Sequence, residues 1–292
     1  MSDGVLVLVG TPIGNLGDMA PRAVDALASA DVVCCEDTRR TGRLLAHLGI
    51  ERRPLIVVNE HTERRQVPGV LERLARGERV AVVSDAGMPG ISDPGERLVR
   101  AALDAGHAVE VVPGPAAAVA ALVVSGLPSG RFVFEGFLPR RGHGRAERLA
   151  AVAAEPRTVL LHEAPHRLAR TLADLAAACG GDRRVAVARE LTKLHEEVWR
   201  GTLDEALAWV AEREPPGEIV IVLDGAPGAP PPDDDAVRAR LRDALASGAT
   251  RSDAARAVAA ELGIARRHAY DLVNELADGH AGGPTPPAEP AR

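Results

Sequence analysis

Residues 80–95 read VAVVSDAGMPGISDPG: four apolar residues, then a loop that holds three glycines, two prolines and two aspartates. An apolar run without alternation is typical of a strand that is covered on both faces, as in a parallel sheet. Ligands of open α/β sheets bind beyond the carboxyl ends of the strands, where this loop would lie. The stretch therefore predicts an α/β fold with a ligand site in residues 84–95.

Further apolar runs alternate with helix-like segments on both sides of this stretch. The other strands expected in the same sheet are Val5–Val9, Val32–Cys35, Leu55–Val58 and Val109–Val112. Short connections and crossover helices between them predict a parallel sheet. We assign residues 1–138 to an N-terminal α/β domain that binds the ligand.

A second α/β set follows in the sequence. Its helices are expected to begin at Arg145, His166 and Leu203, and its strands are expected at Thr158–Leu161, Val185–Ala188, Glu197–Gly201 and Glu218–Leu223. We assign residues 139–224 to a second α/β domain, with a mixed sheet, that closes the cleft.

The remaining residues differ in composition. Residues 225–235 read GAPGAPPPDDD, which is typical of a linker. Residues 236–278 predict a small helical appendage, with helices near Ala236–Ala246 and Ser252–Leu276. Residues 279–292 are rich in proline and glycine, and we expect them to be disordered.

Charge and composition limit the possible functions. The net charge of −6 describes solubility, so binding of a polyanion would depend on local basic clusters. The apolar runs are too short or too rich in alanine to span a bilayer, and no signal-like segment opens the chain, so we expect a cytoplasmic protein. Cys34, Cys35 and Cys179 are expected to be small buried hydrophobic residues, and no metal site is expected.

Two further loops follow predicted strands. Residues 10–18 read GTPIGNLGD, which is not the dinucleotide pattern and alone fits a tight turn as well as a ligand loop. Residues 112–117 read VPGPAA and would open a helix whose free N–H groups could face a ligand.

The loop at 84–95 is the most informative of the three. Asp85 and Asp93 would repel phosphate, and no basic residue precedes Arg97. Carboxylates suit a cationic or zwitterionic ligand, and S-adenosylmethionine has a sulfonium, an amino group and no phosphate. The alternative is a turn that only connects a strand to a helix.

The quoted motifs, with residues 36–39 (EDTR), 135–139 (EGFLP), 163–167 (EAPHR) and 188–193 (ARELTK), resemble the small-subunit ribosomal RNA ribose-2′-O-methyltransferases of the tetrapyrrole-methylase superfamily. The resemblance covers most of positions 5–223. It implies two α/β domains with S-adenosylmethionine in the cleft between them, and a homodimer. The implied reaction is 2′-O-methylation of one cytidine in the decoding region of 16S rRNA in the small ribosomal subunit.

The resemblance also implies the residues of the site. The cofactor would be bound by Thr11, Pro12, Gly14, Asn15, Asp37, Asp85, Ala86, Gly87, Ser92, Asp93, Pro113, Gly114, Pro115 and Ala116. The catalytic candidates from the second domain are Lys193, Glu190, Glu163 and His166, with Arg167 facing the same cleft.

A ribose hydroxyl is a weak acid, so a base or a well-placed cation should assist its loss of a proton. Lys193 is the only lysine of the chain, which suggests a site that needs a compact ammonium able to lose its proton. Glu163, His166 and Glu190 are rival candidates, and the base cannot be assigned from spacing.

RNA would be held by local arginine clusters. The expected contacts are Arg39, Arg40, Arg43, Arg140, Arg141, Arg145, Arg266 and Arg267. Aromatic residues make up 2% of the chain, so a long platform for stacking single-stranded RNA is not expected. The C-terminal helices could add RNA contacts or only pack on the body.

Three other functions remain open. A methyltransferase for a tetrapyrrole would share the fold but would need an apolar, aromatic-lined cleft. In an NAD-dependent oxidoreductase Asp37 would bind the adenine ribose, although the acidic loop disfavours a pyrophosphate. A non-catalytic ribosome-assembly factor would bind RNA alone.

Overall fold

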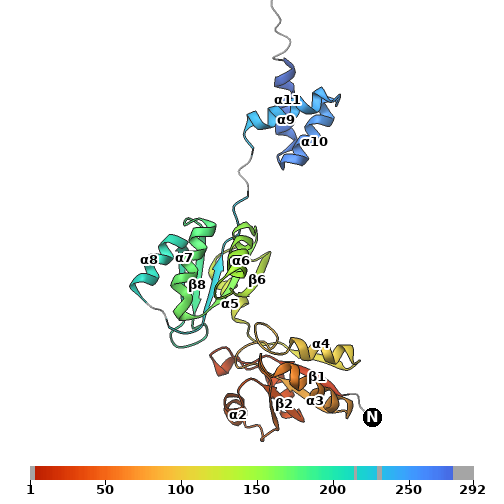
Figure 1. Ribbon diagram of the computed structural model, residues 1–292, viewed down its shortest axis with the longest axis vertical. Helices are drawn as coiled ribbons and strands as arrows, with labels where there is room; N and C mark the ends of the chain where they lie inside the picture. Colours follow the sequence, from red (N-terminus) through yellow and green to blue (C-terminus); the bar gives the residue numbers. More distant parts are fainter. Residues whose placement is uncertain (1–3, 214–215, 229–231, 279–292) are drawn as a thin grey trace, which may run out of the picture. The chain divides into compact units, whose positions relative to one another are not determined.

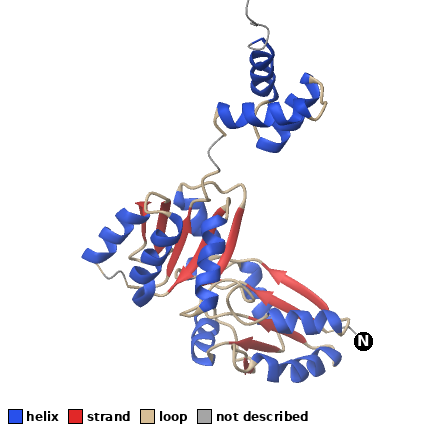
Figure 2. Ribbon diagram, turned by 45° about the horizontal axis from the view of Figure 1, so that its top comes forward, coloured by secondary structure: helices blue, strands red, loops and turns tan. Residues whose placement is uncertain are grey.

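The computed structural model describes residues 4–213, 216–228 and 232–278. The chain divides into two compact units, residues 1–226 and 227–292 (Figure 1). The first unit contains two β-sheets, and the second contains helices (Figure 2). No helix in the described part of the chain is long and apolar enough to cross a membrane.

The first sheet is parallel, as predicted. Its order is β3-β2-β4-β1-β5, with bounds β1 Val5–Val9, β2 Val32–Cys35, β3 Leu55–Val57, β4 Arg79–Val82 and β5 Ala108–Val112. The helices of this first lobe are α1 Pro21–Ala28, α2 Thr38–His47, α3 Glu63–Ala75 and α4 Glu96–Asp104.

The apolar runs of these strands follow from burial on both faces. Val33 and Cys35 pack with α1 and α2, while Val32 and Cys34 pack with α3 and α4. Successive strand residues point to opposite faces, so each must be apolar when helices cover both sides. Cys34 and Cys35 are fully buried, which confirms them as small core residues, whereas Cys179 is only partly buried.

The second sheet is mixed, which confirms the predicted fold class. Its order is β6-β7-β10-β8-β9, with bounds β6 Phe132–Phe137, β7 Thr158–Glu163, β8 Arg184–Arg189, β9 Glu197–Thr202 and β10 Ile219–Leu223. Only the β6–β7 pair is parallel among the described strands of this sheet. The helices of this second lobe are α5 Ala117–Ser125, α6 His143–Ala154, α7 Leu168–Cys179 and α8 Leu203–Glu212.

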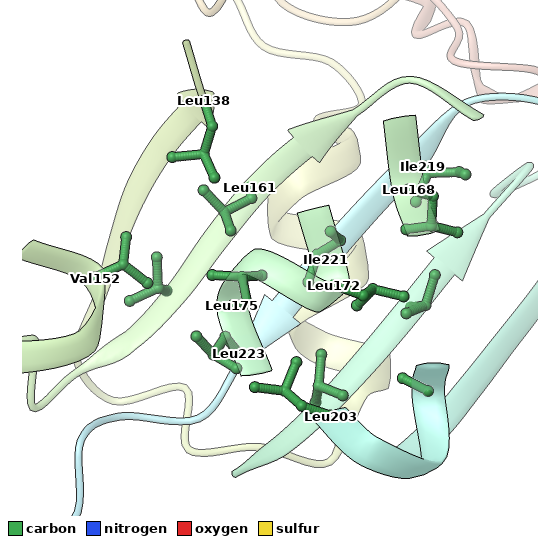
Figure 3. Close-up of a cluster of buried hydrophobic side chains, with 14 of the residues drawn as sticks. Leu138, Val152, Leu161, Leu168, Leu172, Leu175, Leu203, Ile219, Ile221 and Leu223 are labelled. Atoms are coloured by element: carbon green, nitrogen blue, oxygen red, sulfur yellow. The ribbon is translucent and has the colours of Figure 1, made fainter. Parts of the chain in front are cut away.

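One face of the second sheet forms a large core with α6, α7 and α8, in which Leu161, Leu172 and Ile221 are fully or almost fully buried (Figure 3). The other face packs against α5 through Leu122 and Val222. Ile13, from the first loop of the first lobe, is part of the same core as α5, so apolar packing joins the two lobes.

The predicted domain boundary at residue 138 is therefore wrong. Helix α5 and strand β6 precede that boundary in the sequence, yet both belong to the second sheet. The sequence prediction placed them in the first domain because they follow its last strand without a linker.

The second unit contains helices α9 Asp234–Ala246, α10 Arg251–Leu262 and α11 Arg266–Asp278, packed around Val237, Leu241 and Val258. The segment expected to be helical over Ser252–Leu276 contains two helices, because Gly263 is left-handed (φ 65°) and ends α10. Helix α9 begins inside the predicted linker because Asp233 caps it, accepting from the Ala236 N–H at 2.7 Å. The tail expected over residues 279–292 lies outside the described residues.

Candidate active site

The three predicted loops meet at one edge of the first sheet. Thr11 and Gly87 exchange backbone hydrogen bonds of 2.9 and 3.2 Å, which join the first loop to the second. The first and third loops approach so closely that a Cβ atom at Gly10 would lie 2.6 Å from the Gly114 Cα. A side chain at either glycine would therefore separate the loops.

A cavity of about 390 Å³ opens beside these loops, between the two lobes, and its volume is that of a small-molecule site. The first lobe and α5 line it with residues that include Glu36, Arg40, Asp85, Ala86, Gly87, Met88, Ile91, Ser92, Asp93 and Ala116. The second lobe contributes residues that include Phe137, His162, Glu163, Leu191, Gly217 and Glu218.

The first-lobe wall of the cavity is acidic. The Asp85 N–H donates to Glu36 Oε1 at 2.9 Å, and Arg40 Nη1 lies 3.3 Å from Asp85 Oδ2. Burial raises the pKa of Asp93 to about 7, with Glu36 and Asp85 adding to the shift. Burial also raises the pKa of Glu36. With Arg40 as the one basic side chain among these groups, the wall favours a cation and disfavours phosphate.

Lys193 lies beside the first loop. A Cβ atom at Gly14 would lie 2.4 Å from the Lys193 Cγ, so the missing side chain makes room for the lysine. The Lys193 ammonium bonds Glu190 at 2.9 Å and Glu218 at 3.2 Å. Partial burial acts to lower the pKa of Lys193, but these two carboxylates outweigh it and raise the pKa.

The interpretation of Lys193 as a readily deprotonated ammonium is therefore wrong for this structure. Its two carboxylate partners hold the side chain in the charged form. The sequence reasoning missed this effect because Glu218 is 25 positions away and reaches Lys193 only through the fold.

Glu163 and His166 lie in different surroundings. Glu163 lines the cavity, but its carboxylate accepts from Thr171 Oγ1 at 2.6 Å and lies 3.1 Å from Arg167 Nε. His166 is exposed and lines a second hollow of about 270 Å³. We call this second hollow the arginine hollow; its lining residues are Arg140, Arg145, His166, Arg167 and Arg170.

His162 is a cavity residue that the sequence analysis did not find. Its ring contacts Phe134 and Phe137 edge-on, with centroids 5.1 and 5.4 Å away. Burial lowers the pKa of His162, and its Nε2 is buried without a hydrogen-bond partner among the described residues. His162 lies within an apolar strand, 158–163, and nothing in the sequence distinguishes a cavity-lining histidine there from one packed in the core.

Eight of the fourteen predicted cofactor residues are not among the residues that line the cavity: Thr11, Pro12, Gly14, Asn15, Asp37, Pro113, Gly114 and Pro115. Thr11 and Pro12 line a neighbouring hollow with Arg40 and Arg43. Asn15 caps a short 3-10 helix, Leu16–Asp18. Pro113, Gly114 and Pro115 form the third loop. They lead into Ala116, which does line the cavity.

Asp37 does not line the cavity. It caps α2, and hydrogen bonds from Arg39 lower the pKa of Asp37 to about 2. Its carboxylate bonds the first turn of α2 and the Arg39 side chain, and its contact with the cofactor stays a prediction.

The arginines predicted to bind RNA fall into two groups. Arg39, Arg40, Arg43, Arg140, Arg141, Arg266 and Arg267 are exposed. Arg145 is buried, and it donates to Asp174, Thr171 and the Pro139 carbonyl. The expectation that Arg145 is a surface contact is wrong, because its partners come together only when α6 packs on α7.

Comparison with known proteins agrees with this geometry. A family model described as Tetrapyrrole (Corrin/Porphyrin) Methylases matches residues 5–207. The solved uroporphyrin-III-C-methyltransferase from Thermus thermophilus aligns with a TM-score of 0.53 and 25% identity, over 75% of this chain and 94% of that one. The methyltransferase CobJ shares the fold, with a TM-score of 0.59 and 24% identity, over 77% of this chain and 95% of that one. The fold and the cavity thus define a methyltransferase of the tetrapyrrole methylase class.

Relatives of higher identity narrow the class. The ribosomal RNA small subunit methyltransferase I of Synechocystis sp. is 48% identical over 94% of this chain and 100% of its own length. That of Mycobacterium tuberculosis is 45% identical over 98% and 100%, and that of Xylella fastidiosa is 53% identical over 76% and 82%. The chain belongs to the ribosomal RNA small subunit methyltransferase I family, which confirms the resemblance noted in its motifs.

Proposed function

We propose that this protein uses S-adenosylmethionine to methylate the ribose 2′-hydroxyl of a cytidine in the decoding region of 16S rRNA. The observation that carries the proposal is the acidic cavity at the edge of a tetrapyrrole methylase fold. Its relatives are named as ribosomal RNA small subunit methyltransferases, which supports RNA of the small subunit as the substrate.

The residues of the cavity fit S-adenosylmethionine. Asp85 and Asp93 offer negative charge to a cation, and Gly87, with φ 88°, lines the same cavity. The close contact between Gly10 and Gly114 brings the first and third loops together, and the Met88 sulfur accepts from the Gly114 N–H at 3.3 Å. A pyrophosphate would instead face Glu36, Asp85 and Asp93, which disfavours a dinucleotide.

The protein contributes orientation and electrostatics to the reaction. When bound, S-adenosylmethionine supplies a methyl group on a positively charged sulfur, so positioning provides most of the rate acceleration. Lys193, held by Glu190 and Glu218 next to Gly14, is a fixed positive charge that can stabilise a developing alkoxide. Asp93, with a pKa of about 7, can accept a proton near neutral pH.

Exposed arginines support contact with a polyanion. Arg40 and Arg43 line a hollow of about 420 Å³ that shares Arg40 and Asp85 with the main cavity. We further propose that the substrate is the small ribosomal subunit, that the protein acts in the cytoplasm, and that it is a homodimer.

Transfer of a labelled methyl group tests the proposed function. The protein is incubated with labelled S-adenosylmethionine and with isolated small subunits, naked 16S rRNA or a tetrapyrrole. Label at a single ribose of the small-subunit RNA is the expected result. Label on the tetrapyrrole alone, or on no acceptor, would overturn the proposal.

A further inference from the structure

The arginine hollow has a charge opposite to that of the main cavity. Four arginines and one histidine line it, and the carboxylates bonded to these arginines are Asp174 and Glu163. Four positive charges against two negative charges leave an excess of two, before His166 is counted. An anion is the ligand that this surplus favours.

One buried arginine and one partly buried arginine form the base of the hollow. The Arg145 and Arg167 side chains are 5% and 18% exposed. Arg145 Nη1 donates to the Pro139 carbonyl at 2.9 Å, and Arg167 Nη2 donates to the Leu138 carbonyl at 2.7 Å. Both arginines therefore hold the turn that carries Arg140, so that residue is attached to a fixed backbone.

The remaining donors are available to a ligand. Arg140 and His166 are exposed and have no hydrogen bond or ion pair within the described part of the chain. Arg170 is 63% exposed and lies 3.9 Å from Asp174, at the limit of an ion pair. Helix α7 begins at Leu168 without a side-chain cap, so its partial positive charge adds to the arginines.

The hollow and the main cavity are neighbours along the chain. Ala164 and Pro165 line the cavity, while His166 and Arg167 line the hollow. The ion pair between Glu163 and Arg167 lies at the boundary, with the carboxylate on the cavity side. Negative charge is thus concentrated on one side of the boundary and positive charge on the other.

We propose that the arginine hollow binds a backbone phosphate of the RNA substrate, next to the nucleotide whose ribose enters the cavity. The inference rests on the proposed function. The acidic wall admits a cationic methyl donor and excludes phosphate, while the hollow holds the phosphodiester that the cavity repels. Free inorganic phosphate has the same chemistry, so the test includes it as a separate arm.

The variants are Arg140→Ala and Arg170→Ala in the full chain. Both side chains are exposed, whereas loss of Arg145 or Arg167 would remove buried hydrogen bonds. Arg100→Ala is the matched control, because Arg100 is 81% exposed and pairs with Asp104 four residues on, as Arg170 pairs with Asp174.

Binding to isolated small subunits is measured at several KCl concentrations. Each variant is expected to bind about tenfold more weakly, with a log–log salt slope lower by about one, while Arg100→Ala matches the wild type. Affinity for S-adenosylmethionine should not change. Wild-type subunit affinity and salt slope in both variants would overturn the inference.

Inorganic phosphate is titrated separately, with the arginine Nε–H resonances of Arg140 and Arg170 as the signal. A wild-type shift of the Arg170 signal that is lost in Arg140→Ala, and of the Arg140 signal that is lost in Arg170→Ala, supports an anion site without any need for methyl transfer; no shift of either signal in the wild type would overturn it. If phosphate shifts these signals but subunit binding is unaffected by the variants, the assignment to RNA is overturned. If wild-type protein methylates no RNA while phosphate still binds, the proposed function fails and the anion site stands.

Discussion

Asp93 is a titratable residue of the cavity whose state should change near neutral pH. Burial raises the pKa of Asp93 to about 7, so the carboxyl is mostly protonated at pH 6 and mostly ionised at pH 8. A sulfonium donor is attracted by the ionised form alone. Affinity for S-adenosylmethionine should therefore rise with pH across this window, by at most about tenfold per unit.

Calorimetry at pH 6, 7 and 8 measures this dependence. S-adenosylhomocysteine, which lacks the positive sulfur, is the control ligand and should show a weaker dependence. Asp93→Asn should remove the difference between the two ligands. Equal pH profiles for both ligands in the wild-type protein would show that Asp93 does not respond to the sulfonium.

The second prediction at the scale of residues concerns Lys193 and Glu190. Lys193→Ala and Glu190→Ala should keep the fold, because both side chains are partly exposed, at 28% and 21%, and should lose most methyl transfer, by about a hundredfold. Lys193→Arg separates two roles, since arginine keeps the charge but cannot lose its proton. We expect Lys193→Arg to exceed Lys193→Ala in single-turnover rate; full turnover in both alanine variants would contradict the assignment.

Some residues of the site could be predicted from sequence and others could not. Asp85 and Asp93 follow a strand directly, so the fold alone carries them to the ligand edge. Arg145 could not be placed, because its partner Asp174 is 29 positions away and a loop arginine is usually exposed. His162 gave no signal because strand burial conceals a polar side chain among apolar neighbours.

At the scale of elements, the first and third loops are in close backbone contact. A Cβ atom on Gly114 would lie 2.8 Å from the Gly10 Cα, which is backbone and cannot rotate away. Gly114→Ala should therefore destabilise the protein by about 1–3 kcal/mol and weaken S-adenosylmethionine binding. Gly69→Ala in α3 is the control: nothing lies within 4 Å, and the change should stabilise by up to about 1 kcal/mol.

Urea unfolding and calorimetry measure both variants. Unchanged stability and donor affinity in Gly114→Ala would show that the loops can separate without consequence.

Apolar strands could be predicted because burial on both faces leaves a continuous pattern, as in Val32–Cys35. A continuous apolar pattern also explains why the sequence did not show which sheet α5 covers. Residues 117–125 read AAVAALVVS and are apolar on every side of the helix, so no direction of packing is marked. Only the contact with Leu160 and Val222 reveals that α5 covers the second sheet.

At the scale of the whole molecule, residues 1–226 contain every residue of the cavity and four of the five hydrophobic clusters. A chain that ends at Ala226 should fold and bind S-adenosylmethionine with the affinity of the full chain. Thermal melting and calorimetry check this expectation. An unfolded product, or a loss of donor binding, would show that the second unit supports the first.

The same truncation examines the role of Arg266 and Arg267, which are exposed on α11. Weaker binding to small subunits would assign these helices to the RNA contact. Unchanged subunit affinity would exclude that role.

The charge distribution of the whole molecule explains how a chain of net charge −6 can act on RNA. Acidic groups gather in the cavity, while exposed arginines gather in the neighbouring hollows. Binding then depends on where the charges lie, and the total reports only solubility.

The most direct measurement is calorimetric titration of the full-length protein with S-adenosylmethionine and, separately, with NAD. We expect saturable binding of S-adenosylmethionine and no heat from NAD, because the carboxylates of the cavity attract a sulfonium and repel a pyrophosphate. Binding of NAD without any binding of S-adenosylmethionine would contradict the claim that the acidic cavity is a site for a cationic methyl donor.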